Sequence, residues 1–195
     1  MLRLGDNSGQ HPAPMKSSSL DKHWQPHPAC TDARLRHWLL DRGSLTRRIQ
    51  LRCDRFQVEL LSQCITALDR DERAISGVRA GARCVMREVS LNCGQRAVVF
   101  AHSVAARRAL RGPWRMLATL GARPLGAALF ADPRVKRHAL RFRQLGPRHE
   151  LYRRACRLLE HPPACLWARR SLFVRRGARL LVTEVFLPAI LELTP

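Results

Sequence analysis

Long hydrophobic runs are absent from this chain of 195 residues. No apolar stretch reaches the ~20 residues that a membrane-spanning helix needs. The first residues also lack the basic segment followed by an apolar segment that marks a secretion signal. These absences argue against a membrane-inserted or secreted protein, so we expect a cytoplasmic location and no membrane insertion.

Cysteine motifs are also missing, although the sequence contains seven cysteines. No two of them form a C-x-x-C pair, and none lies with histidines at the spacing of a zinc site. Their number is odd, and their positions are 30, 53, 64, 84, 93, 156 and 165. We therefore expect a reduced chain with independent buried thiols, and no bound metal.

Lysine and acidic residues are scarce. Lysine occurs only at positions 16, 22 and 136, whereas Lys and Arg together number 35 against 15 Asp and Glu, which gives a formal net charge of +20. Such a charge invites a nucleic-acid-binding function. The arginines are scattered over the whole length instead of forming a stripe, so nucleic-acid binding is kept only as an alternative. The positive field should attract small anions.

Aromatic residues make up only 6% of the chain, but 46% of it is apolar, so aliphatic side chains can fill a core. This length favours a single domain. Residues 1–29 are rich in Pro, Ser, His and Gly without apolar periodicity, which predicts a disordered leader. The folded domain is expected over residues 30–195.

Periodicity in the remaining chain predicts both helices and strands. Helices are expected over about 32–42 and 149–160, the second with its arginines on a solvated side. One strand is expected at 56–63, and two hairpins join 84–91 to 97–104 and 166–174 to 179–187. Residues 43–46 and 66–81 read as loops. The pattern is typical of an α+β domain whose mostly antiparallel sheet is covered on one side by helices.

Two of these strands carry one charge each on an otherwise apolar face. Arg87 lies among aliphatic residues, and Glu184 lies between Val182 and Phe186. On the strand alone, a structural glutamate in a buried ion pair is the simpler interpretation of Glu184. If the two charges are instead held apart, they define a slot for a small ring with a carboxylate at one end and a hydroxyl at the other.

Five segments in order resemble the chorismate pyruvate-lyase family. They are Leu39-Leu40-x3-Ser44-Leu45-Thr46, Met86-Arg87-Glu88-Val89, Leu120-Gly121-x2-Pro124-Leu125-Gly126-x2-Leu129-Phe130, Trp167-Ala168-Arg169-Arg170-Ser171 and Leu181-Val182-Thr183-Glu184-Val185-Phe186-Leu187-Pro188. Each is weak alone, but the ordered series is specific. The resemblance implies a sheet of about six antiparallel strands. It also implies a carbon–oxygen lyase that converts chorismate to 4-hydroxybenzoate and pyruvate at the head of ubiquinone synthesis.

The resemblance also implies roles for individual residues. Arg87 and Glu184 are the candidate catalytic residues, with Arg87 binding the ring carboxylate and Glu184 the ring hydroxyl. Backbone amides of Leu45 and Leu125 would complete the carboxylate site from two covering loops. Whether Glu184 also transfers a proton, or the departing side chain takes it, stays open. No metal or other cofactor is implied, a monomer is expected, and residues 136–163 receive no role.

Two other functions compete with this one. Effector-binding domains of some bacterial transcription regulators resemble the same fold, but the leader is too short and too rich in proline to supply a helix-turn-helix domain. A basic nucleic-acid binder would show strongly salt-dependent binding. Among the other polar residues, we expect His102 to be a hydrogen-bonded structural residue. At most one of Arg169 and Arg170 can face the pocket, because neighbouring residues of a strand alternate in direction.

Overall fold

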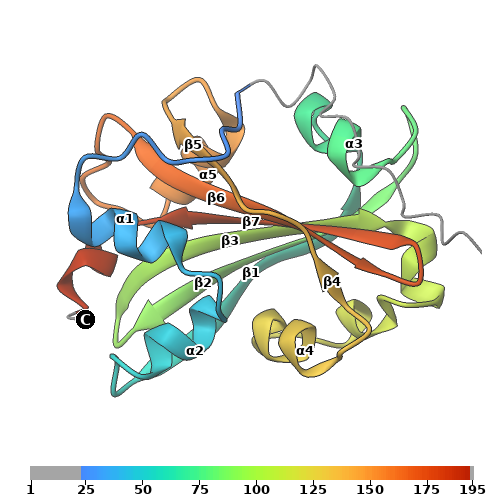
Figure 1. The fold of residues 1–195 in the computed structure, drawn as a ribbon, viewed down its shortest axis with the longest axis horizontal. Helices are drawn as coiled ribbons and strands as arrows, with labels where there is room; N and C mark the ends of the chain where they lie inside the picture. Colours follow the sequence, from blue (N-terminus) through green and yellow to red (C-terminus); the bar gives the residue numbers. More distant parts are fainter. Residues whose placement is uncertain (1–22, 194–195) are drawn as a thin grey trace, which may run out of the picture.

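The computed structural model describes residues 23–193, which form one antiparallel sheet with helices packed against it (Figure 1). The described strands form a seven-stranded sheet in the order β1-β2-β3-β7-β6-β4, with β5 also paired to β6. The strands are β1 (Phe56–Thr66), β2 (Cys84–Cys93), β3 (Arg96–Ala106), β4 (Lys136–Arg137), β5 (Arg141–Leu145), β6 (Leu166–Arg175) and β7 (Ala178–Phe186). Since β4 and β5 follow one another along the same edge of β6, the sheet is six positions wide. The α+β class is confirmed.

Both predicted hairpins are present. The turn between β2 and β3 contains Gly94, whose φ of 59° is a left-handed conformation that glycine adopts without strain. The turn between β6 and β7 contains Arg176 and Gly177, with φ of 48° and 75°. Strand β7 then pairs with β3, so that Ser103 lies opposite Val182. The two hairpins therefore form one continuous centre of the sheet.

The two predicted helices are also present. They are α1 (Ala33–Leu40) and α5 (Glu150–Cys156). Helix α1 begins after Asp32, whose carboxylate accepts a hydrogen bond from the Leu35 amide at 3.0 Å. Such a cap satisfies one of the amides that a helix start leaves without a partner. Helix α5 is capped in the same way by the His149 side chain.

Three further α-helices complete the described part of the chain, namely α2 (Leu45–Gln50), α3 (Arg70–Ser76) and α4 (Leu125–Ala131). The loops predicted at 43–46 and 66–81 are therefore partly wrong. Helix α2 begins at Leu45 because the Ser44 hydroxyl accepts the Arg47 amide at 3.3 Å. All three helices have at most seven residues, which is too short to show a helical repeat of apolar side chains.

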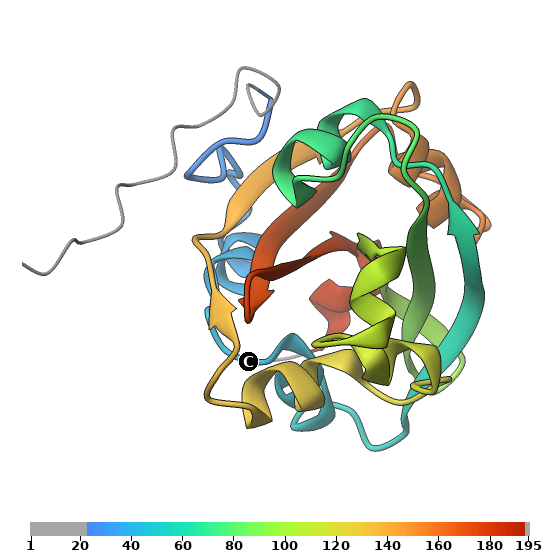
Figure 2. The same ribbon diagram turned by 90° about the vertical axis from the view of Figure 1, so that its right-hand side faces the viewer.

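Helices cover both faces of the sheet, as Figures 1 and 2 show. Helices α1, α2 and α4 lie on the face toward which Arg87 points, together with 3₁₀ helices at Arg107–Arg111 and Arg115–Ala118. Helices α3 and α5 lie on the other face. The expectation of helices on one side only is wrong. Strand β2 is buried continuously from Cys84 to Leu91, which requires cover on both faces.

A disulfide joins Cys53 to Cys93, so the expectation of independent, reduced thiols is wrong for this pair. Cys53 follows α2 by three residues, and Cys93 is the last residue of β2. The pairing of β1 with β2 places Phe56 opposite Cys93, which brings the two thiols together across 40 residues of sequence. No short motif could signal that contact. The other five cysteines are free, and two of them, Cys30 and Cys84, are buried.

The N-terminal boundary of the fold lies earlier than expected. Trp24 is 3% exposed and packs in the core with Leu145 and Leu151. Gln25 pairs with Phe142 through two backbone hydrogen bonds of 2.8 Å. The predicted leader over residues 1–29 is thus wrong for its last part, and residues 1–22 lie outside the described residues. No helix between residues 23 and 193 has the length and apolar character to cross a membrane.

Candidate active site

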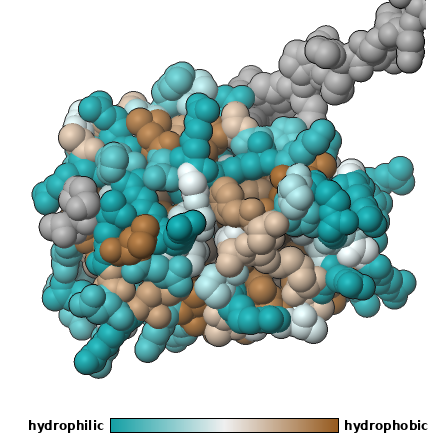
Figure 3. Space-filling model, turned by 60° about the horizontal axis from the view of Figure 1, so that its bottom comes forward, coloured by the Kyte–Doolittle hydropathy of each residue, from teal (hydrophilic) through white to brown (hydrophobic). Residues whose placement is uncertain are grey.

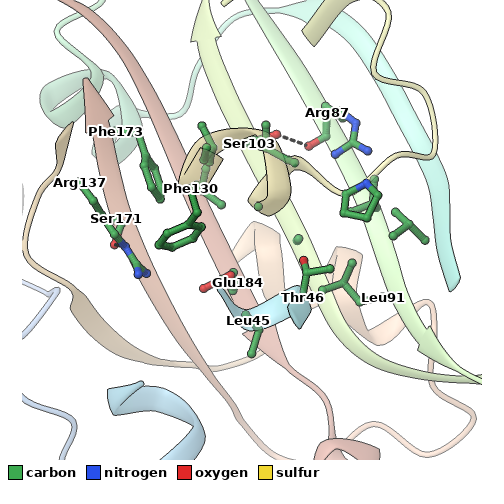
Figure 4. A pocket seen from close by; sticks show the side chains of 18 of the residues that line it. Leu45, Thr46, Arg87, Leu91, Ser103, Phe130, Arg137, Ser171, Phe173 and Glu184 are labelled. Atoms are coloured by element: carbon green, nitrogen blue, oxygen red, sulfur yellow. Dashed lines mark hydrogen bonds between the residues drawn. The ribbon is translucent and has the colours of Figure 1, made fainter. Parts of the chain in front are cut away.

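A pocket lies between the sheet and the two helices α2 and α4 (Figure 4). Its floor is formed by aliphatic side chains of the strands, namely Val58, Val89, Leu91, Ala101 and Val182. Its roof consists of Leu45, Thr46, Pro124, Leu125, Gly126, Leu129 and Phe130. Besides Thr46 of the roof, five polar side chains line it, which are Arg87, Ser103, Arg137, Ser171 and Glu184. Both charges that stood out in the sequence therefore line one apolar pocket.

Arg87 and Glu184 are held apart within this pocket. Arg87 pairs across β3 with Ser103, which in turn pairs with Val182, two residues before Glu184 on β7. Two strand spacings sideways and two residues along the strand put their Cα atoms about 12 Å apart. Figure 4 shows the two side chains at opposite ends of the pocket. The pair is thus not a salt bridge. The space between the two charges has aliphatic walls, so it can accept a ring that carries a polar group at each end.

Arg87 is 3% exposed and forms no ion pair with any residue of the described chain. Its Nε and Nη2 atoms donate to the carbonyl of Gly121 at 3.3 and 2.7 Å, and Nη2 also donates to the carbonyl of Arg123 at 3.0 Å. Burial lowers the pKa of Arg87 to about 10, so the side chain stays charged at neutral pH. The backbone carbonyls occupy one edge of the guanidinium, and Nη1 is left to donate to an anion in the pocket.

Glu184 is anchored from below by Arg169. The Arg169 Nε donates to Glu184 Oε2 at 2.5 Å, and Nη1 donates to the carbonyl of Asp41 at 2.7 Å. The same Nη1 reaches the carbonyls of Trp38 and Leu39 at 3.0 and 3.2 Å, at the end of α1. Arg169 is completely buried, so this network is shielded from water. It leaves Oε1 as the glutamate oxygen that can bind a ligand.

Arg169 and Arg170 point to opposite faces, as their alternation predicted. Arg170 lies on the far face, where it contacts Asp71 at 3.3 Å and stacks over the ring of Trp24. Both arginines are at most 1% exposed. Both form ion pairs, Arg169 with Glu184 and Arg170 with Asp71. The role of Arg169 beneath Glu184 was not anticipated, because it depends on the pairing of β6 with β7.

The two residues expected to supply backbone amides, Leu45 and Leu125, begin the neighbouring helices α2 and α4 that roof the pocket. Leu45 packs in the cluster that contains Val89 and Phe186, and Leu125 packs with Val85 and Leu180. Each is the first residue of its helix, so its amide has no acceptor within the helix. The expected covering loops are in fact helix starts. The assignment of both amides to the carboxylate site stays a prediction.

Helices α2 and α4, the two lids over the pocket, touch each other at Gly126. A Cβ atom at this position would lie 3.2 Å from Ser44 Oγ and 3.3 Å from Thr46 Oγ1. The absence of a side chain therefore allows the start of α4 to close against the start of α2. Seen from the side of these helices, the surface is a mosaic of hydrophobic and hydrophilic residues (Figure 3), and Phe130 of α4 is 46% exposed.

One charged residue of the pocket, Arg137, was missed by the sequence analysis. Arg137 extends from β4, where its Nε donates to Ser171 Oγ at 3.0 Å and its Nη1 to the carbonyl of Arg42 at 2.6 Å. Its guanidinium carbon lies 5.5 Å from the ring centres of both Phe130 and Phe173. Strand β4 comprises only two residues and shows no alternation, so the sequence pattern could not indicate that Arg137 points into the pocket.

Charged residues on the far face of the sheet form a separate network. His102 lies 2.9 Å from both Glu72 and Glu88 and is 2% exposed, which confirms the prediction of a structural histidine. Burial by itself lowers the pKa of His102, but the two carboxylates raise it to about 9. Arg154 of α5 donates to Glu88 at 2.8 Å, so its expected position on a solvated side is wrong. This network does not reach the pocket.

Comparison with known proteins agrees with the geometry. The family model for chorismate lyase matches residues 21–193. A protein of Nitrosospira multiformis named "Probable chorismate pyruvate-lyase" is 51% identical over 171 residues, which cover 87% of this chain and 95% of that protein. This chain belongs to the chorismate lyase family. An identically named protein of Azoarcus sp. is 49% identical over 189 residues, covering 94% and 97% of the two chains. The family suggested by five short segments is confirmed.

Solved structures share the fold of this chorismate lyase family member at low identity. The effector domain of PhnF from Mycobacterium smegmatis superposes with a TM-score of 0.53 at 14% identity, covering 76% of this chain and 91% of that chain. A transcriptional regulator of the GntR family from Bacillus cereus gives a TM-score of 0.52 at 9% identity, covering 68% and 92%. These likenesses show a common fold and carry no function with them.

Proposed function

We propose that this chain is a chorismate pyruvate-lyase, which eliminates pyruvate from chorismate to give 4-hydroxybenzoate for ubiquinone synthesis. The observation that carries the proposal is the pocket with Arg87 at one end, Glu184 at the other and aliphatic walls between them. It complements a flat ring that bears a carboxylate opposite a hydroxyl. Membership of the chorismate lyase family supports the same substrate.

The reaction does not require a covalent bond between substrate and protein. The bond between ring carbon 3 and the ether oxygen breaks, and the carbon that bears the hydroxyl loses its proton. The ring becomes aromatic, and the departing enolpyruvate takes up a proton to become pyruvate. Because aromatisation supplies much of the driving force, the enzyme has mainly to orient the ring, balance its charges and exclude water. No cofactor is part of the proposed reaction.

We assign the polar contacts by their position along the slot. Arg87 Nη1 and the Leu125 amide bind the ring carboxylate, and the Glu184 Oε1 atom accepts the ring hydroxyl. We assign the Leu45 amide to the ring carboxylate as well. Support comes from the contact between the two helix starts, because Gly126, next to Leu125, lies against Ser44 and Thr46 on either side of Leu45.

Each lid is linked by hydrogen bonds to one charged end of the pocket. Arg87 holds the turn of Gly121 and Arg123 that leads into α4. Arg169, beneath Glu184, holds the end of α1 that leads into α2. A ring that engages both ends therefore supports both lids in the closed position. We expect slow release of 4-hydroxybenzoate for this reason.

We further propose that the protein acts as a monomer in the cytoplasm. One chain supplies the floor, the roof and both charged ends of the pocket, which supports a monomeric active site. The substrate is a dianion, which does not cross a lipid bilayer unaided because desolvation of its charges is costly. Gel filtration at micromolar concentration and cell fractionation test the two statements.

The test of the function is incubation of the purified protein with chorismate, with pyruvate and 4-hydroxybenzoate followed together. Equal amounts of both products are expected, and their absence at micromolar enzyme would overturn the proposal. Binding of chorismate without turnover would point instead to an effector-binding domain.

Glu184→Gln separates the two roles of the glutamate, because the amide can anchor a hydroxyl but cannot accept a proton. A loss of roughly 10²–10⁴ in kcat is expected if Glu184 transfers the proton. A loss below about tenfold would leave it as an anchor, and the proton would then pass to the departing side chain.

A further inference from the structure

Arg137 is a cation in the pocket that forms no ion pair within the described chain. Its Nε and Nη1 atoms donate to a hydroxyl and a carbonyl, the Ser171 side chain and the backbone of Arg42. No hydrogen bond or ion pair within residues 23–193 uses its Nη2. Burial lowers the pKa of Arg137, although the charge of Glu184 opposes that shift. A guanidinium in this environment gains from any carboxylate that comes within reach.

Arg137 is placed to bind the second carboxylate of chorismate, for which the residues assigned so far provide no cation. Figure 4 shows its guanidinium directed toward the Glu184 end of the pocket. Chorismate carries two carboxylates, one on the ring and one on the enolpyruvyl group, whose ether oxygen is attached to the carbon next to the hydroxyl. If Glu184 holds the hydroxyl, the second carboxylate must therefore lie near Glu184 and far from Arg87. Besides Arg87, Arg137 is the one cationic side chain of the described chain that lines the pocket.

Arg137 also lies where the departing group can leave. It lines the pocket and, in addition, an adjoining surface groove that contains Arg42, His138 and Arg141. Arg169, the other arginine at this end, donates through Nε to Glu184 and through Nη1 to backbone carbonyls, and it does not line the pocket. A carboxylate bound at Arg137 therefore lies at the border between the apolar pocket and a basic exit.

We propose that Arg137 binds the carboxylate of the enolpyruvyl group, and so selects chorismate over ring compounds that lack this group. The inference rests on the proposed lyase function. It makes Arg137 a substrate-binding residue for the part of chorismate that leaves as pyruvate, whereas Arg87 binds the part that stays. Loss of Arg137 should consequently affect substrate and product differently.

The test compares steady-state turnover of chorismate with equilibrium binding of 4-hydroxybenzoate in matched variants. Arg137→Met should lower kcat/KM for chorismate roughly 100-fold, as expected for one partner of a buried charge pair. Its Kd for 4-hydroxybenzoate should stay within about threefold of the wild-type value, because the product has no enolpyruvyl carboxylate. Arg87→Met should weaken both. The control Arg134→Met removes an exposed arginine of the same segment and should change neither.

Three outcomes would overturn the inference while the lyase function stands. Arg137→Met could turn over chorismate as the wild type does, it could lose affinity for product as much as for substrate, or Arg137→Lys could fail to recover any activity. Absence of turnover in the wild type would instead remove the proposed function itself. The two failures are therefore distinguishable.

A measurement on the wild type covers the case in which Arg137→Met does not fold. A 4-hydroxybenzoate that carries a carboxymethoxy group next to the hydroxyl presents a carboxylate at the proposed position. It should bind at least about tenfold more tightly than its neutral methyl ester on that group. Equal affinity of the acid and the ester would refute the role of Arg137 without any variant.

Discussion

The disulfide between Cys53 and Cys93 leads to a prediction whose size follows from the structure. The two residues are 40 positions apart, and the bond closes the loop that contains all of β1, α3 and β2. In the chain-entropy treatment, a loop of that length stabilises the folded state by about 4 kcal/mol at 25 °C. The double variant Cys53→Ser/Cys93→Ser should lose stability of that order.

The disulfide also has a local effect on the site. Cys53 follows α2, whose first residue, Leu45, forms part of the roof of the pocket. Without the bond, the far end of this lid is no longer tied to the end of β2. We therefore expect weaker binding of 4-hydroxybenzoate in the double variant, through faster dissociation.

The assay is urea denaturation followed by tryptophan fluorescence, with and without a dithiol reductant. The oxidised wild type should be more stable than both the reduced wild type and the double variant. Cys64→Ser removes an exposed free thiol and serves as the control. Thiol titration of unfolded, unreduced protein should find five free thiols out of seven cysteines. Seven reactive thiols, or equal stability in all forms, would refute the reasoning and restore the expectation of independent thiols.

Three further predictions concern the lids, the far network and the support of the glutamate. Gly126→Ala should weaken 4-hydroxybenzoate binding roughly tenfold with little change in Tm, because the new methyl group meets the hydroxyls of Ser44 and Thr46; unchanged product affinity would contradict the lid contact. His102 has a raised pKa of about 9, so its stabilisation is complete below its unfolded pKa near 6.5 and is lost as pH rises toward 9. His102→Gln should flatten the fall of unfolding free energy over that range, and a curve parallel to the wild type would refute the assignment. Arg169→Met should cost about 3 kcal/mol in unfolding free energy and abolish turnover, because it leaves the largely buried Glu184 carboxylate without its cation; wild-type kinetics would show that Arg169 has no part in positioning.

Much of the fold follows from local patterns in the sequence. The hairpins of β2–β3 and β6–β7 were predictable because apolar alternation is interrupted by Gly94 and by Gly177, residues that accept a positive φ. Helix α1 was predictable from its apolar spacing and its Asp32 cap. Helices α2 and α3 were missed because a helix of two turns carries too few apolar residues to set a period.

The candidate site was likewise only partly predictable from the sequence. Arg87 and Glu184 stood out because each is a charge on an apolar strand face, and five ordered segments pointed to the chorismate lyase family that the comparisons confirm. Arg137 could not be found by either route. It lies on a two-residue strand, in a region for which the family resemblance offered no alignment.

The sequence by itself determined which side chains share a face, since strand alternation depends only on position in the chain. It thereby determined that Arg87 and Glu184 point into the core. Only the tertiary structure decided that the two charges stand apart with separate partners, because strand order and register set that separation. The same holds for the Cys53–Cys93 bond and for Arg137, whose contacts join segments distant in sequence. Such contacts leave no trace in local composition, because they depend on how separate strands and helices are brought together.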